Sequence, residues 1–194
     1  IVRLGGMKIL VTGADGGIGS AIVETLKSAG HEVVTSTMND TDLTNPEAVR
    51  KLRTRVGTVD WIVCAHGYIE LPEPIEKTFA INTFSLFYLA NEFIEAHMIV
   101  LSSSAGLNPN GKYTAYSASK TAANAFVQAM ALNRKNLKFF AVAPGPTNTE
   151  MRQRVAGDAA QMQSPSVIAE EIKKIVAGES DYTSGDIILI RDGV

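Results

Sequence analysis

A strand-like run, a glycine-rich turn and a helix follow one another near the start of the chain, and this order restricts the possible folds most strongly. The run covers residues 8–12, the turn contains Gly13, Gly17 and Gly19, and a helix is expected over residues 18–29. Glycines let the backbone turn tightly and approach a pyrophosphate, whose charge then lies at the helix N-terminus. This order is the context that a dinucleotide-binding fingerprint requires. An ordinary βα turn with additional glycines is the structural alternative.

The rest of the chain continues this alternation of apolar runs and amphipathic segments. Such alternation predicts a parallel sheet covered by helices on both faces. We expect strands at residues 8–12, 32–36, 59–64, 98–102, 137–143 and 186–190. Helices are expected at residues 18–29, 46–55, 75–95, 116–133 and 166–177. The 194 residues show no repeat or linker, so residues 1–194 are predicted to form one Rossmann-like, doubly wound α/β domain. Residues 1–6 precede Met7 and are expected to be a cloning remnant or a short native extension.

A tyrosine and a lysine one helical turn apart form the second distinctive feature. Tyr116 and Lys120 would share one face of a helix. A phenol has a reference pKa of about 10, and a neighbouring ammonium stabilises the phenolate and lowers that pKa. Ser103 follows the apolar run 98–101, so its hydroxyl can converge on the same spot. The set predicts an acid/base site. A half-buried aromatic residue beside a solvated charge is the structural alternative.

The spacing of the glycines, taken with Ser103, Tyr116 and Lys120, resembles the short-chain dehydrogenase/reductase family. The resemblance covers nearly the whole chain, in order. Asn82 looks like the helix asparagine of the family's catalytic tetrad. The other matching segments are Asp42-Leu43 beside the adenine, Cys64-Ala65-His66-Gly67 where the family usually has Asn-Asn-Ala-Gly, and Ala143 to Thr147, with Thr149 and Met151, under the nicotinamide.

The resemblance implies an oxidoreductase that transfers a hydride between a nicotinamide cofactor and a small carbonyl compound or secondary alcohol. In the family's scheme Tyr116 is the acid/base, Lys120 lowers its pKa and binds the nicotinamide ribose, and Ser103 holds the substrate oxygen. Asn82 would anchor a water for proton relay. The cofactor contacts implied are Thr12, Gly13, Asp15, Gly17, Ile18, Gly19, Ser36, Thr37, Asp42, Leu43, Ala65, His66, Gly67, Tyr116, Lys120, Pro144, Gly145, Thr147 and Thr149.

The segment after the second strand is shorter than in typical family members. Only residues 37–41 separate that strand from Asp42-Leu43, whereas a crossover between parallel strands needs about a dozen residues or more. We therefore expect about six strands, with one edge strand missing. No acid stands at the strand tip and no arginine stands nearby in the sequence. Asp15 should repel a 2′-phosphate, whereas Ser36 and Thr37 could donate to one, so the cofactor is expected to be NADP or NAD, with NADP favoured.

Several polar residues have two readings. Ser102 and Ser104 should point away from the site if the strand alternates there, which favours Ser103. His66 titrates near neutrality in its unperturbed state, but a structural or cofactor-lining role is favoured over a catalytic one. Arg152 and Arg154 could meet an acidic substrate, although a solvated helix face is favoured for both.

Composition limits the partners and the location of the protein. A net charge of −2 gives no electrostatic reason to expect nucleic acid or an anionic membrane as a partner. The single cysteine, Cys64, fits a reducing compartment, and a cytoplasmic location is expected; no metal site is predicted. The apolar faces at Phe84, Phe87 and Tyr88 and at Phe126 and Met130 belong to helices that commonly pair between subunits in the family, so a homodimer or homotetramer is expected.

Two competing functions remain open at this point. One is an NAD(P)-binding regulatory protein without turnover on the same fold, which would have no reason to keep all four tetrad residues. The other is a sugar-nucleotide epimerase or dehydratase, which usually carries a C-terminal substrate domain, whereas only about forty residues follow Thr149.

Overall fold

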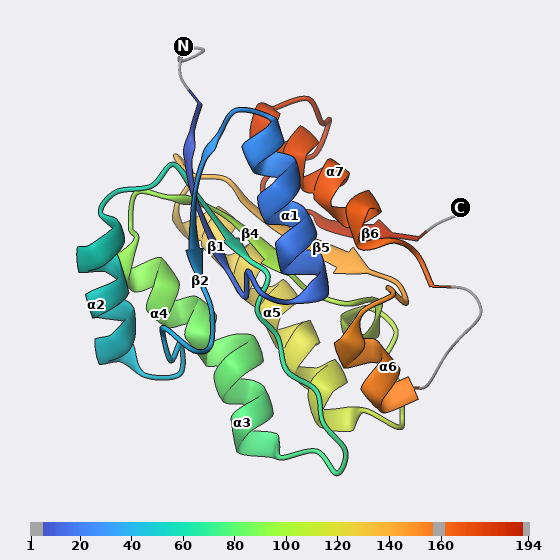
Figure 1. Ribbon diagram of the computed structural model, residues 1–194. Coiled ribbons are helices and arrows are strands. Elements are labelled where there is room, and N and C mark those ends of the chain that lie inside the picture. The colour runs from blue at the N-terminus through green and yellow to red at the C-terminus, as the bar shows by residue number, and fades with distance from the viewer. Residues whose placement is uncertain (1–5, 157–161, 192–194) are drawn as a thin grey trace.

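A six-stranded parallel sheet forms the centre of the protein in the computed structural model, which describes residues 6–156 and 162–191 (Figure 1). The strand order is β2-β1-β3-β4-β5-β6, and every neighbouring pair is parallel. The strands are β1 (Lys8–Thr12), β2 (Glu32–Ser36), β3 (Trp61–Cys64), β4 (His97–Leu101), β5 (Phe139–Pro144) and β6 (Ile187–Ile190). This confirms the predicted α/β class and the predicted number of strands.

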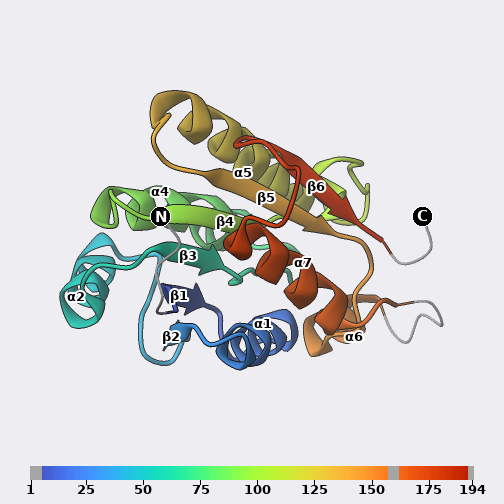
Figure 2. The ribbon, with the colours of Figure 1, turned by 90° about the horizontal axis from the view of Figure 1, so that it is seen from above.

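Helices cover both faces of the sheet, as Figure 2 shows from above. They are α1 (Gly17–Ser28), α2 (Pro46–Val56), α3 (Ile75–Phe79), α4 (Ser85–Glu92), α5 (Thr114–Asn133), α6 (Glu150–Ala156) and α7 (Pro165–Ala177). One apolar core lies between the sheet and α2, α4 and α5, and includes Leu52, Leu89 and Phe126. A second lies between the sheet and α1 and α7, and includes Ile22 and Ile172. The near-continuous apolar sequence of the strands follows from burial on both faces.

The carboxyl ends of the strands meet at one edge, where functional residues of such sheets gather. Thr12 at the end of β1 is level with Ser36 on β2 and with Cys64 on β3. The chain leaves β1 toward β2 on one side and returns to β3 on the other, so the order reverses at β1. Ligands of open α/β sheets bind outside the carboxyl ends of the strands at such a reversal.

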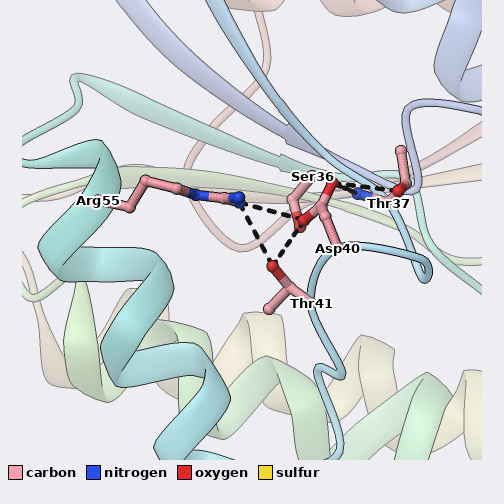
Figure 3. Close-up of polar contacts among 5 residues, drawn as sticks. All are labelled: Ser36, Thr37, Asp40, Thr41 and Arg55. Atoms are coloured by element: carbon pink, nitrogen blue, oxygen red, sulfur yellow. Dashed lines mark hydrogen bonds and ion pairs between the residues drawn. The ribbon is translucent and has the colours of Figure 1, made fainter.

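A short connection follows β2, and Asp40 holds it in place (Figure 3). The Asp40 carboxylate accepts hydrogen bonds from the Ser36 hydroxyl, from the Thr37 amide and hydroxyl, and from the Thr41 hydroxyl. Arg55 on α2 adds an ion pair at 3.1 Å. Burial acts to raise the pKa of Asp40, but the hydrogen bonds from Thr41, Thr37 and Arg55 outweigh it and hold that pKa far below its usual range. The carboxylate therefore fastens β2 to α2.

This cluster corrects one premise of the sequence interpretation. Neither an acid nor an arginine was expected near the tip of the second strand, yet Asp40 and Arg55 both lie there. The expectation failed because residues 37–41 fold back toward the last turn of α2. This places Arg55 next to Asp40, although the two residues are fifteen positions apart in the sequence.

Two helical segments also differ from the prediction. The helix expected over residues 75–95 is divided into α3, a π-helical turn at Ala80–Phe84, and α4. The π-helical turn contains Asn82, whose side-chain oxygen accepts a hydrogen bond from the Tyr68 amide. Turns of this kind occur frequently at functional sites. Residues 150–156, expected as loop, form α6. The remaining boundaries shift by one or two residues, which is within the fraying of helix and strand ends.

Replacing Asp40 with asparagine should lower the free energy of unfolding by about 1 kcal/mol at neutral pH, because an ion pair and charge-assisted hydrogen bonds are lost. The folded-state pKa is lowered, so this contribution is present above the unfolded pKa of about 3.9 and is lost as the pH falls below it. Urea unfolding at pH 7 and pH 3 measures both values. Asp181→Asn, on an exposed loop, is the control, and equal stability of the two variants at pH 7 would contradict the assigned role.

Candidate active site

The glycine turn after β1 leaves room for a ligand's phosphates at the start of α1. Gly13 has φ of +66°, and a Cβ there would lie 2.6 Å from the His66 backbone. A Cβ at Gly19 would lie 2.0 Å from the Gly13 carbonyl oxygen, so a side chain at either position would force the turn apart. No side chain caps the first turn of α1. Its backbone N–H groups therefore fit a pyrophosphate, as the chemistry of a helix N-terminus requires.

His66 belongs to a hydrogen-bonded chain beneath this turn. Thr12 Oγ1 lies 2.6 Å from His66 Nδ1, and His66 Nε2 lies 2.8 Å from Ser85 Oγ. Ser85 donates its hydroxyl proton to the Ile81 carbonyl, so Nε2 donates to Ser85 and Nδ1 accepts from Thr12. Burial and the nearby Lys120 charge lower the pKa of His66 to about 3, which keeps the ring neutral. The chain ties β1 to the start of α4.

Lys120 places its ammonium at the centre of the site. It is 4% exposed, and Nζ donates to the Leu101 carbonyl oxygen at 2.7 Å. Nζ lies 5.8 Å from the centroid of the Tyr116 ring. Burial lowers the pKa of Lys120 to about 8, so the charge is retained at neutral pH. A Cβ at Gly67 would lie 3.4 Å from Nζ and 3.7 Å from Asn82 Oδ1, so the glycine keeps this space open.

Asn82 connects the loop after β3 to α5. Its Oδ1 accepts from the Tyr68 amide at 2.7 Å, and its Nδ2 donates to the Tyr68 carbonyl at 2.9 Å and to Ser119 Oγ at 3.0 Å. Ser119 in turn donates to the Tyr116 carbonyl. The asparagine thus fixes the loop beside Gly67 against the first turns of α5.

Tyr116 and Ser103 lie together on a cavity of about 250 Å³ at the carboxyl edge. Burial raises the pKa of Tyr116, and a hydrogen bond with Ser103 and the positive charge of Arg152 oppose the rise. The Ser103 hydroxyl also accepts from the Ala105 amide at 3.1 Å. Ser102 and Ser104 contribute atoms to the same cavity, but the Ser102 hydroxyl donates to the Lys120 carbonyl at 3.4 Å. Ser103 is the serine that affects the pKa of Tyr116, but Ser102 and Ser104 also line the cavity, contrary to the expectation that both point away.

The other residues expected around the cofactor divide into two groups. The cavity is lined by Ile18, Pro144, Gly145, Thr147 and Thr149. The remaining polar ones are engaged elsewhere: the Thr12 hydroxyl bonds to His66, Ser36 and Thr37 donate to Asp40, and Asp42 accepts from Thr44. Leu43 and Ala65 pack against the two cores, and Asp15 is exposed.

Glu73 is a functional residue that the sequence interpretation missed. Its carboxylate accepts from the Tyr116 amide at 2.7 Å, from the Ala115 amide at 3.0 Å and from the Thr114 hydroxyl at 3.1 Å. It therefore caps the first turn of α5, where no cap from the adjoining chain is present. Burial acts to raise the pKa of Glu73, but these hydrogen bonds outweigh it and lower that pKa. Glu73 lies about forty residues before the helix that it caps, so no local sequence pattern predicts this contact.

A second hollow, of about 500 Å³, lies at the amino ends of the strands. It is lined by Lys8, Glu32, Asp60, Glu95 and His97, among others, and by none of the four tetrad candidates. Within residues 6–156 and 162–191, no group of three histidine, cysteine or acidic residues is placed to hold a metal ion, and no helix is long and apolar enough to cross a membrane.

Comparisons with known proteins agree with this geometry. The family model for short chain dehydrogenases matches residues 40–160. The chain is 30% identical to versicolorin reductase of Emericella nidulans, with 77% of this chain and 72% of that protein covered. It is 25% identical to 7alpha-hydroxysteroid dehydrogenase of Escherichia coli, with 99% and 95% covered. That alignment extends over 245 positions against 194 residues here, so the relative contains segments that this chain lacks.

Solved structures show the same fold. A short chain dehydrogenase from Burkholderia cenocepacia in complex with NADP superimposes with a TM-score of 0.87 at 20% identity, covering 98% of this chain and 90% of that one. A short-chain type dehydrogenase/reductase from Mycobacterium marinum gives 0.87 at 22% identity, with 98% and 96% covered.

Glu73→Ala should lower the free energy of unfolding by about 1 to 2 kcal/mol at pH 7, the usual effect of losing a helix cap. The folded-state pKa is lowered, so the contribution is present above the unfolded pKa of about 4.3 and is lost as the pH falls through the acid range. Chemical denaturation at both pH values measures this. Glu76→Ala, also acidic but exposed on α3, serves as the control. A loss no larger than in the control would exclude the cap.

Proposed function

This chain belongs to the short-chain dehydrogenase/reductase family, and from that premise we propose that it interconverts a small carbonyl compound and the corresponding secondary alcohol with NAD(P) as cofactor. Its named relatives are reductases and dehydrogenases, and the chain is an oxidoreductase. The observation that carries the specific proposal is the meeting of Tyr116, Ser103 and the Lys120 ammonium at one edge of the sheet. When bound, the nicotinamide supplies a hydride for reduction or accepts one in oxidation.

Tyr116 is proposed as the acid/base of the reaction. In reduction its hydroxyl gives a proton to the carbonyl oxygen, and in oxidation the phenolate takes a proton from the alcohol. Ser103, which lines the same cavity, would hold the same oxygen and stabilise the charge that develops on it. Both side chains line the cavity, so a substrate can reach them.

Lys120 and Asn82 are proposed to complete the tetrad. The Lys120 ammonium is positioned to donate to a ribose hydroxyl, because only one of its three donors is engaged, by Leu101, among the described residues. The expected lowering of the Tyr116 pKa by Lys120 is not found: burial raises that pKa, and the charge that opposes the rise is that of Arg152. Asn82 Oδ1 and the Lys120 ammonium both border the space beside Gly67, at 3.7 Å and 3.4 Å from the position of a Cβ there. This arrangement supports Asn82 as the anchor of a proton relay from Lys120 toward solvent.

NADP is proposed as the preferred cofactor, with NAD as the competitor. The Asp40 carboxylate is engaged by Ser36, Thr37, Thr41 and Arg55, so it is not a free acceptor for a ribose 2′-hydroxyl. Arg55 is half-exposed and could exchange part of its ion pair for a 2′-phosphate. The engagement of the Ser36 and Thr37 hydroxyls by Asp40 removes two donors that the sequence interpretation had assigned to that phosphate.

The expected assembly, domain organisation and location are also proposals. Phe84 and Phe87 are 49% and 47% exposed, which supports a homodimer or homotetramer formed through α4 and α5, whereas Phe126 is buried. One sheet joins strands from both halves of the chain, which supports a single NAD(P)-binding domain. Burial raises the pKa of the Cys64 thiol to about 12, and a reducing compartment such as the cytoplasm suits this inert thiol.

Tyr116→Phe should reduce turnover by a factor of about 100 to 10,000, because the proton donor is removed while the ring is kept. Carbonyl compounds and both reduced cofactors are followed at the nicotinamide absorbance, and cofactor affinity, measured by fluorescence titration, should stay within about twofold. Tyr113→Phe alters the other tyrosine that lines the cavity, and it tests which of the two tyrosines is the acid/base. Undiminished turnover in Tyr116→Phe would refute the assignment. Cofactor binding without turnover of any compound by the wild type would favour a regulatory protein instead.

Arg55→Gln should raise the dissociation constant of NADP about tenfold, the effect of losing one charge-assisted contact, and leave that of NAD unchanged. Arg50→Gln, an exposed arginine on the same helix, provides the comparison. Titration of both cofactors against each variant gives the values. Tighter binding of NAD than of NADP by the wild type would overturn the proposed preference.

A further inference from the structure

Arg152 on α6 is a positively charged side chain that lines the candidate active site without a partner. Its Nε atom is buried and makes no hydrogen bond, and no ion pair to Arg152 is present among residues 6–156 and 162–191. A buried donor without an acceptor loses its hydration without compensation, and the cost is larger when the group is charged. A ligand in the cavity would supply the acceptor that this atom lacks.

The position of Arg152 is fixed from two sides. Its backbone amide donates to the Thr149 hydroxyl at 3.2 Å, and the Tyr113 hydroxyl donates to the Val155 carbonyl at 3.1 Å, which ties α6 to α5. Thr149 itself lies against the glycine turn, because a Cβ at Gly17 would approach its Cγ2 to 2.9 Å. Arg152 is thus held close to Tyr116, whose hydroxyl it affects electrostatically.

The charged side chains that line the cavity are all positive. Arg152 and Arg191 both contribute to the lining, and no aspartate or glutamate does so among the described residues. Asn108 and Asn110 add amide groups on the α5 side. A small cavity with two guanidinium groups and no carboxylate favours an anionic occupant.

Arg154 shows that the arginines of α6 do not all lack an ion-pair partner. It lies two residues further along the same helix, is exposed, and forms an ion pair with Glu150. The sequence interpretation placed both arginines on a solvated face. That placement holds for Arg154, whereas Arg152 faces the cavity.

We propose that the substrate carries an anionic oxygen group, a carboxylate or a phosphate, and that Arg152 binds this group while Tyr116 and Ser103 hold the reacting oxygen. The inference rests on the proposed function, since it names the substrate class of the same site. Residues expected at the cofactor line the same cavity of about 250 Å³, so the substrate shares this space with the nicotinamide and is a small oxo acid, hydroxy acid or phosphorylated carbonyl compound. Arg152 is then a specificity-determining residue.

The first test compares charged compounds with matched neutral ones. The probes are 2-, 3- and 4-oxo acids with their methyl esters, and dihydroxyacetone phosphate with dihydroxyacetone. The wild type should favour one class of charged compound by about 10- to 100-fold in kcat/KM, the effect of a charge-assisted contact. A preference within the oxo acid and ester pairs would identify the bound group as a carboxylate, and a preference for dihydroxyacetone phosphate over dihydroxyacetone would identify it as a phosphate. Equal kcat/KM for charged and neutral members in every pair would overturn the inference.

The variants assign that preference to Arg152. Arg152→Gln should abolish it, chiefly through KM, whereas Arg152→Lys should keep part of it because the charge remains. Arg154→Gln should retain it fully. Thermal unfolding of Arg152→Gln and Arg154→Gln checks that both remain folded. A preference that survives in Arg152→Gln would contradict the proposal.

A binding measurement separates the substrate from the cofactor and does not require turnover. Calorimetric titration of the same oxo acids into the protein saturated with oxidised cofactor should show binding that Arg152→Gln weakens about tenfold or more. Cofactor affinity should be unchanged in that variant. A matching loss of cofactor affinity would assign Arg152 to the cofactor's phosphates and overturn the inference. If the protein turns over neutral esters in a Tyr116-dependent reaction but does not bind the oxo acids, this inference alone is wrong. If it binds the oxo acids but turns over no compound, the proposed function alone is wrong.

Discussion

The buried ammonium of Lys120 is the constraint around which the carboxyl edge of the sheet is organised. A charge removed from water must be compensated by hydrogen bonds or by other charges. Here the Leu101 carbonyl oxygen accepts from it, Gly67 leaves space beside it, and Asn82 Oδ1 borders the same space. Burial and the same charge lower the pKa of His66, and its neutral ring links Thr12 to Ser85 by hydrogen bonds.

The elements that bring these groups together are held by contacts distant in sequence. Glu73 caps the helix that carries Tyr116, and Asn82 reaches Ser119 one turn further along that helix. On the other side of the cavity, Tyr113 fastens α6 and thereby Arg152. The orientation of the tyrosine thus depends on two loops and a π-helical turn, while the strands supply a rigid base.

The shortened β2–α2 connection shows how the fold tolerates the loss of an edge unit. A parallel strand at the edge needs a covering helix and a long crossover, and both can be removed together if the remaining ends are joined. Asp40 performs this joining with hydrogen bonds to residues 36, 37 and 41 and an ion pair to Arg55. The glycine turn after β1 and the parallel order of the strands are present beside this short connection.

Local patterns in the sequence predicted the parts of the protein that depend on local physics. The glycine turn, the alternation of strands and helices, and the spacing of Tyr116 and Lys120 are all visible within short windows. The cap from Glu73, the Asp40–Arg55 pair and the inward position of Arg152 depend on contacts across fifteen to about forty residues, and no periodicity announces them. The π-helical turn was hidden because residues 75–95 contain an apolar pattern that an ordinary helix also satisfies. Residues 150–156 gave no signal because seven largely polar residues carry too little amphipathic pattern to distinguish a short helix from a loop.

A crystal structure of the protein with bound oxidised nicotinamide cofactor tests the central claim most directly. We expect the pyrophosphate at the first turn of α1, the nicotinamide ribose within hydrogen-bonding distance of Lys120 Nζ, and the ring beside the Tyr116 hydroxyl and under the Pro144-Gly145 segment. A nicotinamide ring bound away from Tyr116, or a cofactor that avoids the glycine turn, would contradict the proposed active site.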